Sequence, residues 1–303
     1  MPRWTTDDIP DQTGRTAVVT GANSGVGFVT ALWLAKRGAR VTVAGRNEQS
    51  GSRAVDEIRR KAPDGDVTWE RLDLADLGSV RSFAEAFNDR NDALDLLINN
   101  AGVAFVPYGK TVDGFEITFG TNHLGHFALT GRLLPLLLER PEARVVTVSS
   151  DVHEWRRAQL DLNDLHYEQG YKRATAYARS KLANLLFTQE LHRRLVAAGH
   201  TVRSIATNPG PTATNLGPSL PGDRFIRVLL RAVTKSPSVG AAPTLYAATA
   251  LDANGGDLFQ PKRGVPVRHR GAPWAYDKDA ARRLWEISES LTGVSFPVGS
   301  VKP

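Results

Sequence analysis

Short apolar runs alternate along the chain with longer segments of helical periodicity. The runs are rich in Val, Ile and Leu at successive positions, which is typical of strands that are buried on both faces of a parallel sheet. We therefore predict a series of buried parallel strands. They are Arg15–Thr20, Arg40–Ala44, Val67–Leu72, Leu94–Asn99, Arg144–Ser149 and Val202–Thr207.

Helix-length stretches separate these strands, so the order strand, helix, strand repeats from near the start. Crossovers of this kind are right-handed and place helices on both faces of the sheet. The pattern predicts an α/β fold with a single Rossmann-type, doubly wound parallel sheet. No repeat or low-complexity linker divides residues 1–303, so we expect one domain. The predicted helices are Gly25–Arg37, Glu48–Lys61, Leu77–Arg90, Thr121–Glu139 and Tyr177–Ala198.

A segment rich in proline and glycine, residues 209–239, breaks this rhythm after the sixth strand. In open α/β sheets, ligands bind outside the carboxyl ends of the strands, and this segment starts at such an end. We expect it to form a lid over the substrate. Its residues 224–235 predict a helix with a cationic edge and an otherwise apolar surface. Contact of that helix with a membrane surface is the alternative, and we favour the lid.

The composition narrows the class of protein. The chain has no cysteine, which removes disulfides, thiolate metal sites and a cysteine nucleophile, and suits a reducing cytoplasm. No apolar run reaches the roughly 18 residues of a membrane span, and residues 1–13 are polar, so we expect a cytoplasmic protein. The net charge of +6 is spread along the chain, so we expect no nucleic-acid partner. The histidines are scattered, and we expect no metal.

A glycine-rich turn directly follows the first predicted strand and opens the first predicted helix. Such a turn lets the backbone approach a pyrophosphate, whose charge is stabilised by the amides at the helix N-terminus. The spacing Gly-x3-Gly-x-Gly differs from the common dinucleotide fingerprint, and an ordinary strand-to-helix turn is the alternative. The residues that we expect to bind cofactor here are Gly21, Asn23, Ser24, Gly25, Val26 and Gly27.

The end of the second strand indicates which nucleotide binds. In NAD-binding proteins, an acidic residue near this position accepts hydrogen bonds from the ribose 2′-hydroxyl. Here Gly45 stands at that place, and Arg46 and Asn47 follow it. A guanidinium can pair with a 2′-phosphate, so the sequence favours NADP(H), with Arg46 and Asn47 as contacts. The alternative is that Arg46 is a solvated turn residue.

Tyr177 and Lys181 are four positions apart on a strongly helical pattern, so their side chains share one face. An unperturbed phenol has a pKa of about 10, too high for efficient proton exchange near neutral pH. A neighbouring ammonium and a cationic nicotinamide both favour the phenolate, so we expect a lowered pKa for Tyr177. Ser150, after a strand, is placed to hydrogen-bond the reacting oxygen. Asn122 is expected to anchor a water that passes protons from Lys181.

Together these motifs resemble the short-chain dehydrogenases/reductases, in that family's order, over residues 14 to about 215. The resemblance implies an active triad of Ser150, Tyr177 and Lys181, with Asn122 as the fourth member. It also assigns Tyr177 and Lys181 to cofactor binding. The further cofactor positions that it implies are Asp73, Leu74, Asn100, Ala101, Gly102, Pro209, Gly210, and Thr212 or Thr214.

A finer resemblance is to the retinol-dehydrogenase-like and protochlorophyllide-reductase-like branch. It is carried by Thr121–Phe127, Ser180–Asn184, Gly240–Tyr246 and the C-terminal Ala281–Glu286. The separation of Ser150 and Tyr177 is about twice the commoner family spacing, and the insert Trp155–Thr175 is expected to shape the substrate side. Family members often pair through the helices that here begin near Thr121 and Tyr177, so a homo-oligomer is among the expected states.

The sequence therefore predicts an NADP(H)-dependent oxidoreductase that moves a hydride between the nicotinamide and a carbonyl or alcohol. We expect a small to medium, hydrophobic substrate, because the predicted lid is apolar; its identity and the direction of reaction stay open. The alternative is a catalytically silent sensor or scaffold that binds NADP(H). Such a protein typically loses the tyrosine or the lysine, and here both are present.

Overall fold

The computed structural model describes residues 4–167, 170–210 and 236–298. Eight strands form one sheet in the order β3-β2-β1-β4-β5-β6-β7-β8. All neighbouring pairs are parallel except β7 and β8, which form an antiparallel hairpin. The strands are β1 Thr16–Thr20, β2 Arg40–Gly45, β3 Val67–Arg71, β4 Leu96–Asn99, β5 Arg144–Val148, β6 Arg203–Thr207, β7 Leu258–Lys262 and β8 Val265–Arg268.

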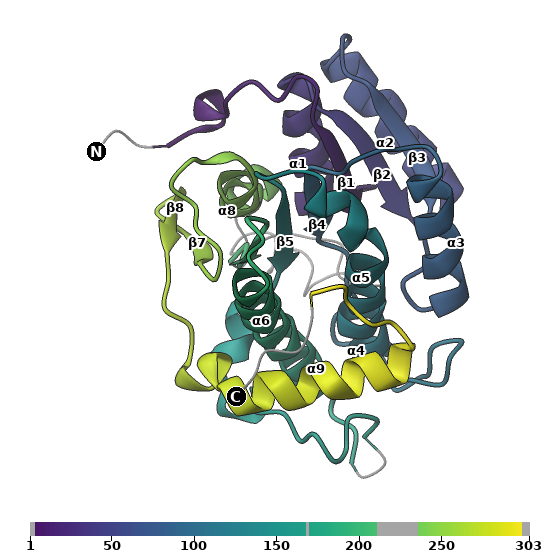
Figure 1. The fold of residues 1–303 in the computed structure, drawn as a ribbon, viewed down its shortest axis with the longest axis vertical. Coiled ribbons are helices and arrows are strands. Elements are labelled where there is room, and N and C mark those ends of the chain that lie inside the picture. The colour runs from purple at the N-terminus through teal and green to yellow at the C-terminus, as the bar shows by residue number, and fades with distance from the viewer. Residues whose placement is uncertain (1–3, 168–169, 211–235, 299–303) are drawn as a thin grey trace, which may run out of the picture.

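Helices cover both faces of the sheet (Figure 1). On one face, α1, α2 and α8 pack on a core that includes Val19 and Val43, whereas Val18 faces the core under α3, α5 and α6. This alternation follows from the strand period of two. The helices are α1 Gly25–Lys36, α2 Glu48–Lys61, α3 Leu77–Asn88, α4 Ile117–Phe119, α5 Gly125–Leu138, α6 Arg173–Ala197, α8 Pro237–Thr249 and α9 Lys278–Thr292.

Capping residues define where several of these helices begin. Asp76 Oδ1 accepts hydrogen bonds from the amides of Gly78 and Ser79 at the start of α3. Asp277 Oδ1 does the same for the first amides of α9, which ends at Gly293 with a φ of 64°. A carboxylate at the N-terminus and a left-handed glycine after the C-terminus both satisfy backbone groups that the helix leaves unpaired. Local sequence therefore fixes these ends.

The C-terminal helix α9 lies across α5 and α6 on the outside of the second layer (Figure 1). Trp285 of α9 packs edge-on against Phe127 of α5 and stacks on Phe187 of α6, and Phe296 closes the cluster. Leu284 and Trp285 are almost fully buried. The predicted pairing of two copies through α5 and α6 stays a prediction, and α9 covers part of that surface.

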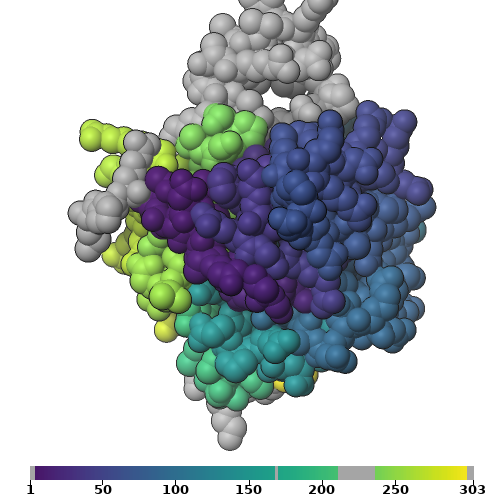
Figure 2. All heavy atoms as spheres, turned by 90° about the horizontal axis from the view of Figure 1, so that it is seen from above, coloured from purple at the N-terminus to yellow at the C-terminus, as the bar shows by residue number. Residues whose placement is uncertain are grey.

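The first and last thirds of the chain meet on the opposite layer. Figure 2 shows the N-terminal third, in purple and blue, beside the green segment that contains α8. Helices α1 and α8 pack against each other, and Trp4 meets Tyr246 of α8 edge-on at a centroid distance of 5.4 Å. The C-terminal part is thus built into the same layered structure as the nucleotide-type motifs.

The predicted Rossmann-type fold class is confirmed, and the predicted strands and helices that fall within the described residues are present, with their ends shifted by a few residues. The helix predicted at residues 224–235 lies outside the described residues. The prediction of two buried faces is wrong for β3, where Thr68 and Arg71 are exposed because this strand is at the edge of the sheet. The helix that was expected from Thr121 starts as a π-helical turn, Gly120–Leu124, which continues into α5. Strands β7 and β8 were not predicted, because their segments are short and each contains a proline, Pro261 or Pro266.

The predicted lid lies mostly outside the described residues, which omit positions 211–235. Its predicted end at residue 239 is wrong, because Pro237–Val239 already form the first turn of α8. Within the described part of the chain, no helix combines the length and the apolar character that crossing a membrane requires.

Candidate active site

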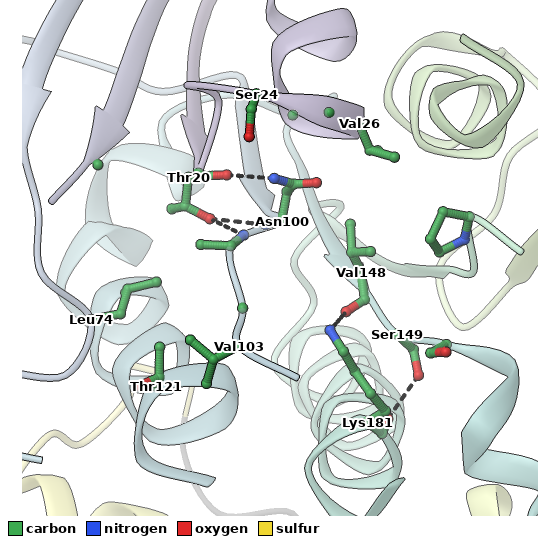
Figure 3. Close-up of a pocket in the computed structure, with 18 of the residues that line it drawn as sticks. Thr20, Ser24, Val26, Leu74, Asn100, Val103, Thr121, Val148, Ser149 and Lys181 are labelled. Carbon is green, nitrogen blue, oxygen red and sulfur yellow. Dashed lines mark hydrogen bonds between the residues drawn. The ribbon is translucent and has the colours of Figure 1, made fainter. Parts of the chain in front are cut away.

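A cavity of about 470 Å³ opens at the carboxyl ends of the central strands, between the first glycine turn and α6 (Figure 3). In a doubly wound sheet the strand order reverses here, between β1 and β4, which leaves room for a ligand. Most of the predicted site residues line this cavity. They are Gly21, Asn23, Ser24, Gly25, Val26, Gly27, Arg46, Asp73, Leu74, Asn100, Ala101, Gly102, Ser150, Tyr177, Lys181, Pro209 and Gly210.

The glycine turn brings the start of α1 to the cavity wall. Gly21 has a φ of 66°, a conformation that favours glycine, and a Cβ at Gly27 would lie 2.7 Å from the carbonyl oxygen of Gly21. Ser24 is the N-cap of α1, but its side chain makes no capping hydrogen bond to the described residues. The first amides of α1 are therefore oriented to bind an anion in the cavity.

A buried histidine supports this turn from behind. His126 Nδ1 lies 2.9 Å from the carbonyl oxygen of Asn122 and must donate to it, so Nε2 accepts a hydrogen bond from Thr20 Oγ1 at 2.9 Å. Burial lowers the pKa of His126 to about 4, so the ring is neutral. Thr20 Oγ1 in turn accepts from the amides of Asn100 and Ala101, each at 2.9 Å (Figure 3). This network fixes the ends of β1 and β4 relative to each other.

His123, three positions before His126, does not take part in this network and contacts α9 instead. His123 Nε2 lies 2.9 Å from Ser288 Oγ of α9, and its ring packs against Phe119 and Phe187. Three positions along the helix is almost one turn, so the relative rotation of the π turn and α5 decides which histidine reaches Thr20. The sequence does not show that rotation.

The far end of the cavity is open and basic. Arg46 is exposed at the end of β2, and among the described residues other than its chain neighbours none has an atom within 4 Å of the position that a Cβ on Gly45 would take. A guanidinium beside an open space suits a phosphate on a ribose. Asn47, also predicted as a contact, lies outside the lining residues, and its Oδ1 caps α2 by accepting from the amide of Ser50 at 2.8 Å. Thr212 lies outside the described residues.

Tyr177 and Lys181 project from α6 toward the cavity, one turn apart. Both side chains are almost fully buried, and Lys181 Nζ is 5.8 Å from the centroid of the Tyr177 ring. Lys181 Nζ donates a hydrogen bond to the carbonyl oxygen of Val148 at 2.9 Å (Figure 3). Ser149 Oγ donates to the carbonyl oxygen of Lys181 at 2.8 Å, which ties α6 to the end of β5. An ammonium has three hydrogens, so two remain for a ligand.

The electrostatics of this pair differ from the sequence expectation. Burial raises the pKa of Tyr177 to about 12; a hydrogen bond with Ser150 lowers it in part, and the charge of Asp151 raises it. Burial also lowers the pKa of Lys181 to about 8. The expected lowering of the Tyr177 pKa is therefore not found in the protein alone, where desolvation has the largest effect and raises it.

Asn122, the fourth predicted residue, is fully buried in the π turn. Its Oδ1 accepts from the amide of Val103 at 2.8 Å, and its Nδ2 donates to the carbonyl of Val103 and to Ser180 Oγ, each at 2.9 Å. Both amide hydrogens are thus used to hold the loop after Gly102 against α6. The predicted water contact stays a prediction, and any such water must donate to an oxygen of Asn122.

The apolar wall next to Tyr177 was not identified from the sequence. Phe105 has a φ of 55°, which is unusual for a large side chain, and its ring lies 5.0 Å from that of Tyr177. Val103 and Val152 line the same wall. Only their position in the sequence could have indicated this wall, because Val103 and Phe105 come just after the Asn99–Gly102 motif.

The predicted insert packs against this wall. Tyr171 donates a hydrogen bond from its hydroxyl to the carbonyl oxygen of Val106 at 3.0 Å and lies 3.3 Å from Glu116 Oε1. Its ring meets Tyr108 edge-on. The insert therefore holds the loop that carries Phe105, and its expected role on the substrate side stays a prediction.

The residues present fit a nicotinamide dinucleotide. Amides at the N-terminus of α1 suit a pyrophosphate, Arg46 lies at one end of the cavity, and Tyr177 and Lys181 lie at the other. A doubly wound sheet with a buried tyrosine and lysine at its switch point suits a dinucleotide-dependent oxidoreductase. This is the class of protein that fold and site define.

Comparisons with known proteins agree with this class. The profile of the short chain dehydrogenase family matches residues 15–161. The chain is 40% identical to mouse retinol dehydrogenase 14, over 93% of this chain and 86% of that protein. It is 42% identical to mouse retinol dehydrogenase 12, over 93% and 88%.

Solved structures give the same result. A crystal structure of an uncharacterized protein from Mycobacterium paratuberculosis is 44% identical, with a TM-score of 0.82 over 98% of this chain and 100% of that one. A short chain dehydrogenase of Shigella flexneri complexed with NADP is 25% identical, with a TM-score of 0.64 over 83% and 98%. The chain belongs to the short-chain dehydrogenase/reductase family and is retinol dehydrogenase-like. It is an NAD(P)-dependent oxidoreductase.

Proposed function

We propose that the chain is an NADP(H)-dependent enzyme that interconverts a carbonyl and an alcohol, with Tyr177 as the acid/base. One observation carries this proposal: Tyr177, Ser150 and Lys181 line the same cavity as the glycine turn of α1. When bound, the nicotinamide supplies or accepts the hydride. The chain must therefore hold the cofactor, bind the substrate oxygen and move one proton.

In the direction of reduction, the phenol of Tyr177 donates its proton to the substrate oxygen. A pKa near 12 keeps that proton on Tyr177 at neutral pH until a base forms beside it. Ser150 Oγ, which is hydrogen-bonded with the phenol, is placed to hold the same oxygen. The Lys181 ammonium stabilises the phenolate that remains and offers its two free hydrogens to the cofactor ribose. In the direction of oxidation the same groups act in reverse.

Arg46 is the basis for NADP(H) over NAD(H). It directly follows Gly45, which stands where an acidic residue would bind an unphosphorylated ribose, and both residues line the cavity. Two structural relatives with 25% identity were crystallised with NADP and NADPH, which supports this choice.

The apolar wall supports a hydrophobic substrate. Val103, Phe105 and Val152 surround the side of the cavity next to Tyr177, and apolar walls bind apolar ligands by excluding water. The curated relatives are named retinol dehydrogenases, so retinol and retinal belong among the compounds to be tested. We propose a small to medium hydrophobic alcohol or carbonyl as the substrate class.

A coenzyme and substrate panel tests the proposal. The purified chain is mixed with NADPH or NADH and with aliphatic aldehydes, aromatic ketones or retinal, and loss of coenzyme absorbance is followed. We expect turnover of hydrophobic carbonyls with NADPH, and much slower turnover with NADH. A preference for NADH would contradict the role of Arg46. Tight NADPH binding without turnover of any compound would favour the sensor or scaffold alternative.

A further inference from the structure

We propose that His153 is a positioning residue for Ser150, and that its imidazole holds the main chain of Ser150 in place for the reaction. The inference rests on the proposed function, because it concerns the residue that binds the reacting oxygen. His153 lies in the short 3₁₀ turn Asp151–Glu154 that follows Ser150. It does not line the cavity, and it acts through Ser150.

The hydrogen bonds of His153 converge on one carbonyl group. His153 Nδ1 lies 2.5 Å from the carbonyl oxygen of Ser150, and the His153 amide donates to the same oxygen at 3.2 Å. A carbonyl oxygen only accepts, so Nδ1 carries the hydrogen. The side chain thus adds a second donor to a turn that would otherwise have one.

The ring is held in this orientation by the segment before α9. The side chain of His153 is fully buried, and a Cβ on Gly271 would lie 2.8 Å from its Nε2. Trp274 Nε1 donates to the carbonyl oxygen of His153 at 2.8 Å. A glycine that leaves room for the ring and an indole that binds its main chain fix the turn from the side opposite the cavity.

Among the described residues, only Nδ1 of the His153 ring makes a hydrogen bond. Its Nε2 has no hydrogen-bond partner among the described residues and lies 3.9 Å from Glu154 Oε1, which is 2.6 Å from His269 Nε2. Burial lowers the pKa of His153; the hydrogen bond to Ser150 and the charges of Glu154 and Asp151 oppose that change, and His269 adds to it. The neutral ring therefore makes its one hydrogen bond to Ser150.

The position of Ser150 Oγ depends on this contact. Ser150 Oγ donates to Asp151 Oδ1 at 3.0 Å and is hydrogen-bonded with the Tyr177 phenol. Ser150 is half-buried at the end of β5, so rotation of its peptide would move Oγ away from Tyr177. Small displacements of a reacting group cost large factors in rate.

Two substitutions of similar size separate the hydrogen bond from the packing. His153→Asn places an amide nitrogen near the position of Nδ1, whereas His153→Leu fills the site without a donor. We expect His153→Asn to retain most of kcat and His153→Leu to lower kcat by about 10- to 100-fold. NADPH affinity, measured by fluorescence titration, should stay within about twofold of wild type in both, because the turn lies outside the glycine-rich wall.

A third variant covers the case in which His153→Leu does not fold. Trp274→Phe removes the indole N–H and keeps an aromatic ring, and we expect a several-fold lower kcat with unchanged NADPH affinity. Three results would each overturn the inference. The first is an equal kcat in His153→Leu and wild type, and the second is an equal loss of kcat in His153→Leu and His153→Asn. The third applies where His153→Leu is unfolded, and it is an unchanged kcat in Trp274→Phe. The proposed function fails separately, if wild type shows no turnover or if Tyr177→Phe retains it.

Discussion

The two walls of the cavity are held together in different ways. The nucleotide wall is the side of the cavity formed by the glycine turn before α1 and by the ends of neighbouring strands. Its hydrogen bonds join Thr20 directly to Asn100 and Ala101. The substrate wall, which is the apolar wall of Val103, Phe105 and Val152, depends on segments far along the chain. Trp274 binds the turn after Ser150, and Tyr171 binds the loop after Phe105. Substitutions should therefore change nucleotide affinity and turnover separately.

The largest effect is expected where α9 braces α6. Trp285 is almost fully buried among Phe127, Phe187 and Phe296, so Trp285→Ala leaves a large cavity. We expect a loss of about 3–5 kcal/mol in the free energy of unfolding, measured in urea. Trp285→Phe is the matched control, because Trp285 Nε1 has no partner among the described residues and a phenyl ring refills most of the space. Equal stability of the Ala and Phe variants would refute the bracing role.

A change in the nucleotide wall should alter affinity alone. Arg46→Asp replaces a cation with an anion beside the proposed 2′-phosphate, and we expect at least about tenfold weaker NADPH binding and improved NADH binding. Arg53→Asp, on the exposed surface of the neighbouring α2, is the control for charge. Calorimetric titration with both nucleotides measures the change. Equal weakening by the two variants would show that Arg46 acts only through net charge.

A smaller effect is expected at the substrate wall. Phe105→Ala removes the ring that packs on Tyr177, and such aromatic contacts contribute about 0.5–1.5 kcal/mol. We expect a several-fold rise in KM for hydrophobic carbonyls in steady-state assays, with NADPH affinity unchanged. Val112→Ala, at an exposed position of the neighbouring loop, should leave both constants unchanged. A weaker affinity for NADPH in Phe105→Ala would contradict the separation of the two walls.

The smallest effect concerns pH in the direction of reduction. Because the pKa of Tyr177 is raised to about 12, the phenol stays protonated at neutral pH and can donate throughout that range. We expect kcat for reduction to change by less than about twofold between about pH 6 and 7.5, and to fall above pH 8 as Lys181 loses its charge. Oxidation needs the phenolate, so its rate should rise with pH. A reduction rate that falls steeply below pH 7.5 would contradict this assignment.

The nucleotide wall could be predicted from the sequence because its information is local. The glycines of a strand-to-helix turn and the residues after β2 and β4 can be placed at the cavity from their positions next to a strand. The placement of Ser150 at this edge of the sheet was also predictable, because it follows a parallel strand, and the family resemblance assigned Tyr177 and Lys181 to the same site. The shared face of Tyr177 and Lys181 follows from the helical repeat.

The substrate wall could not be predicted in the same way. The contact of Trp274 with His153 joins residues far apart in the sequence, and nothing local to either indicates it. The raised pKa of Tyr177 follows from burial, which depends on packing by other segments. The strands β7 and β8 form because β6 offers an edge to pair with, not because their own sequence is strand-like.

The central claim is tested most directly by Tyr177→Phe, which removes one oxygen and keeps the ring that packs on Phe105. In single-turnover reactions with bound NADPH and a hydrophobic carbonyl, the account predicts a rate lower by at least about 100-fold, with NADPH affinity close to wild type. A wild-type rate of coenzyme oxidation in this variant would show that another group supplies the proton.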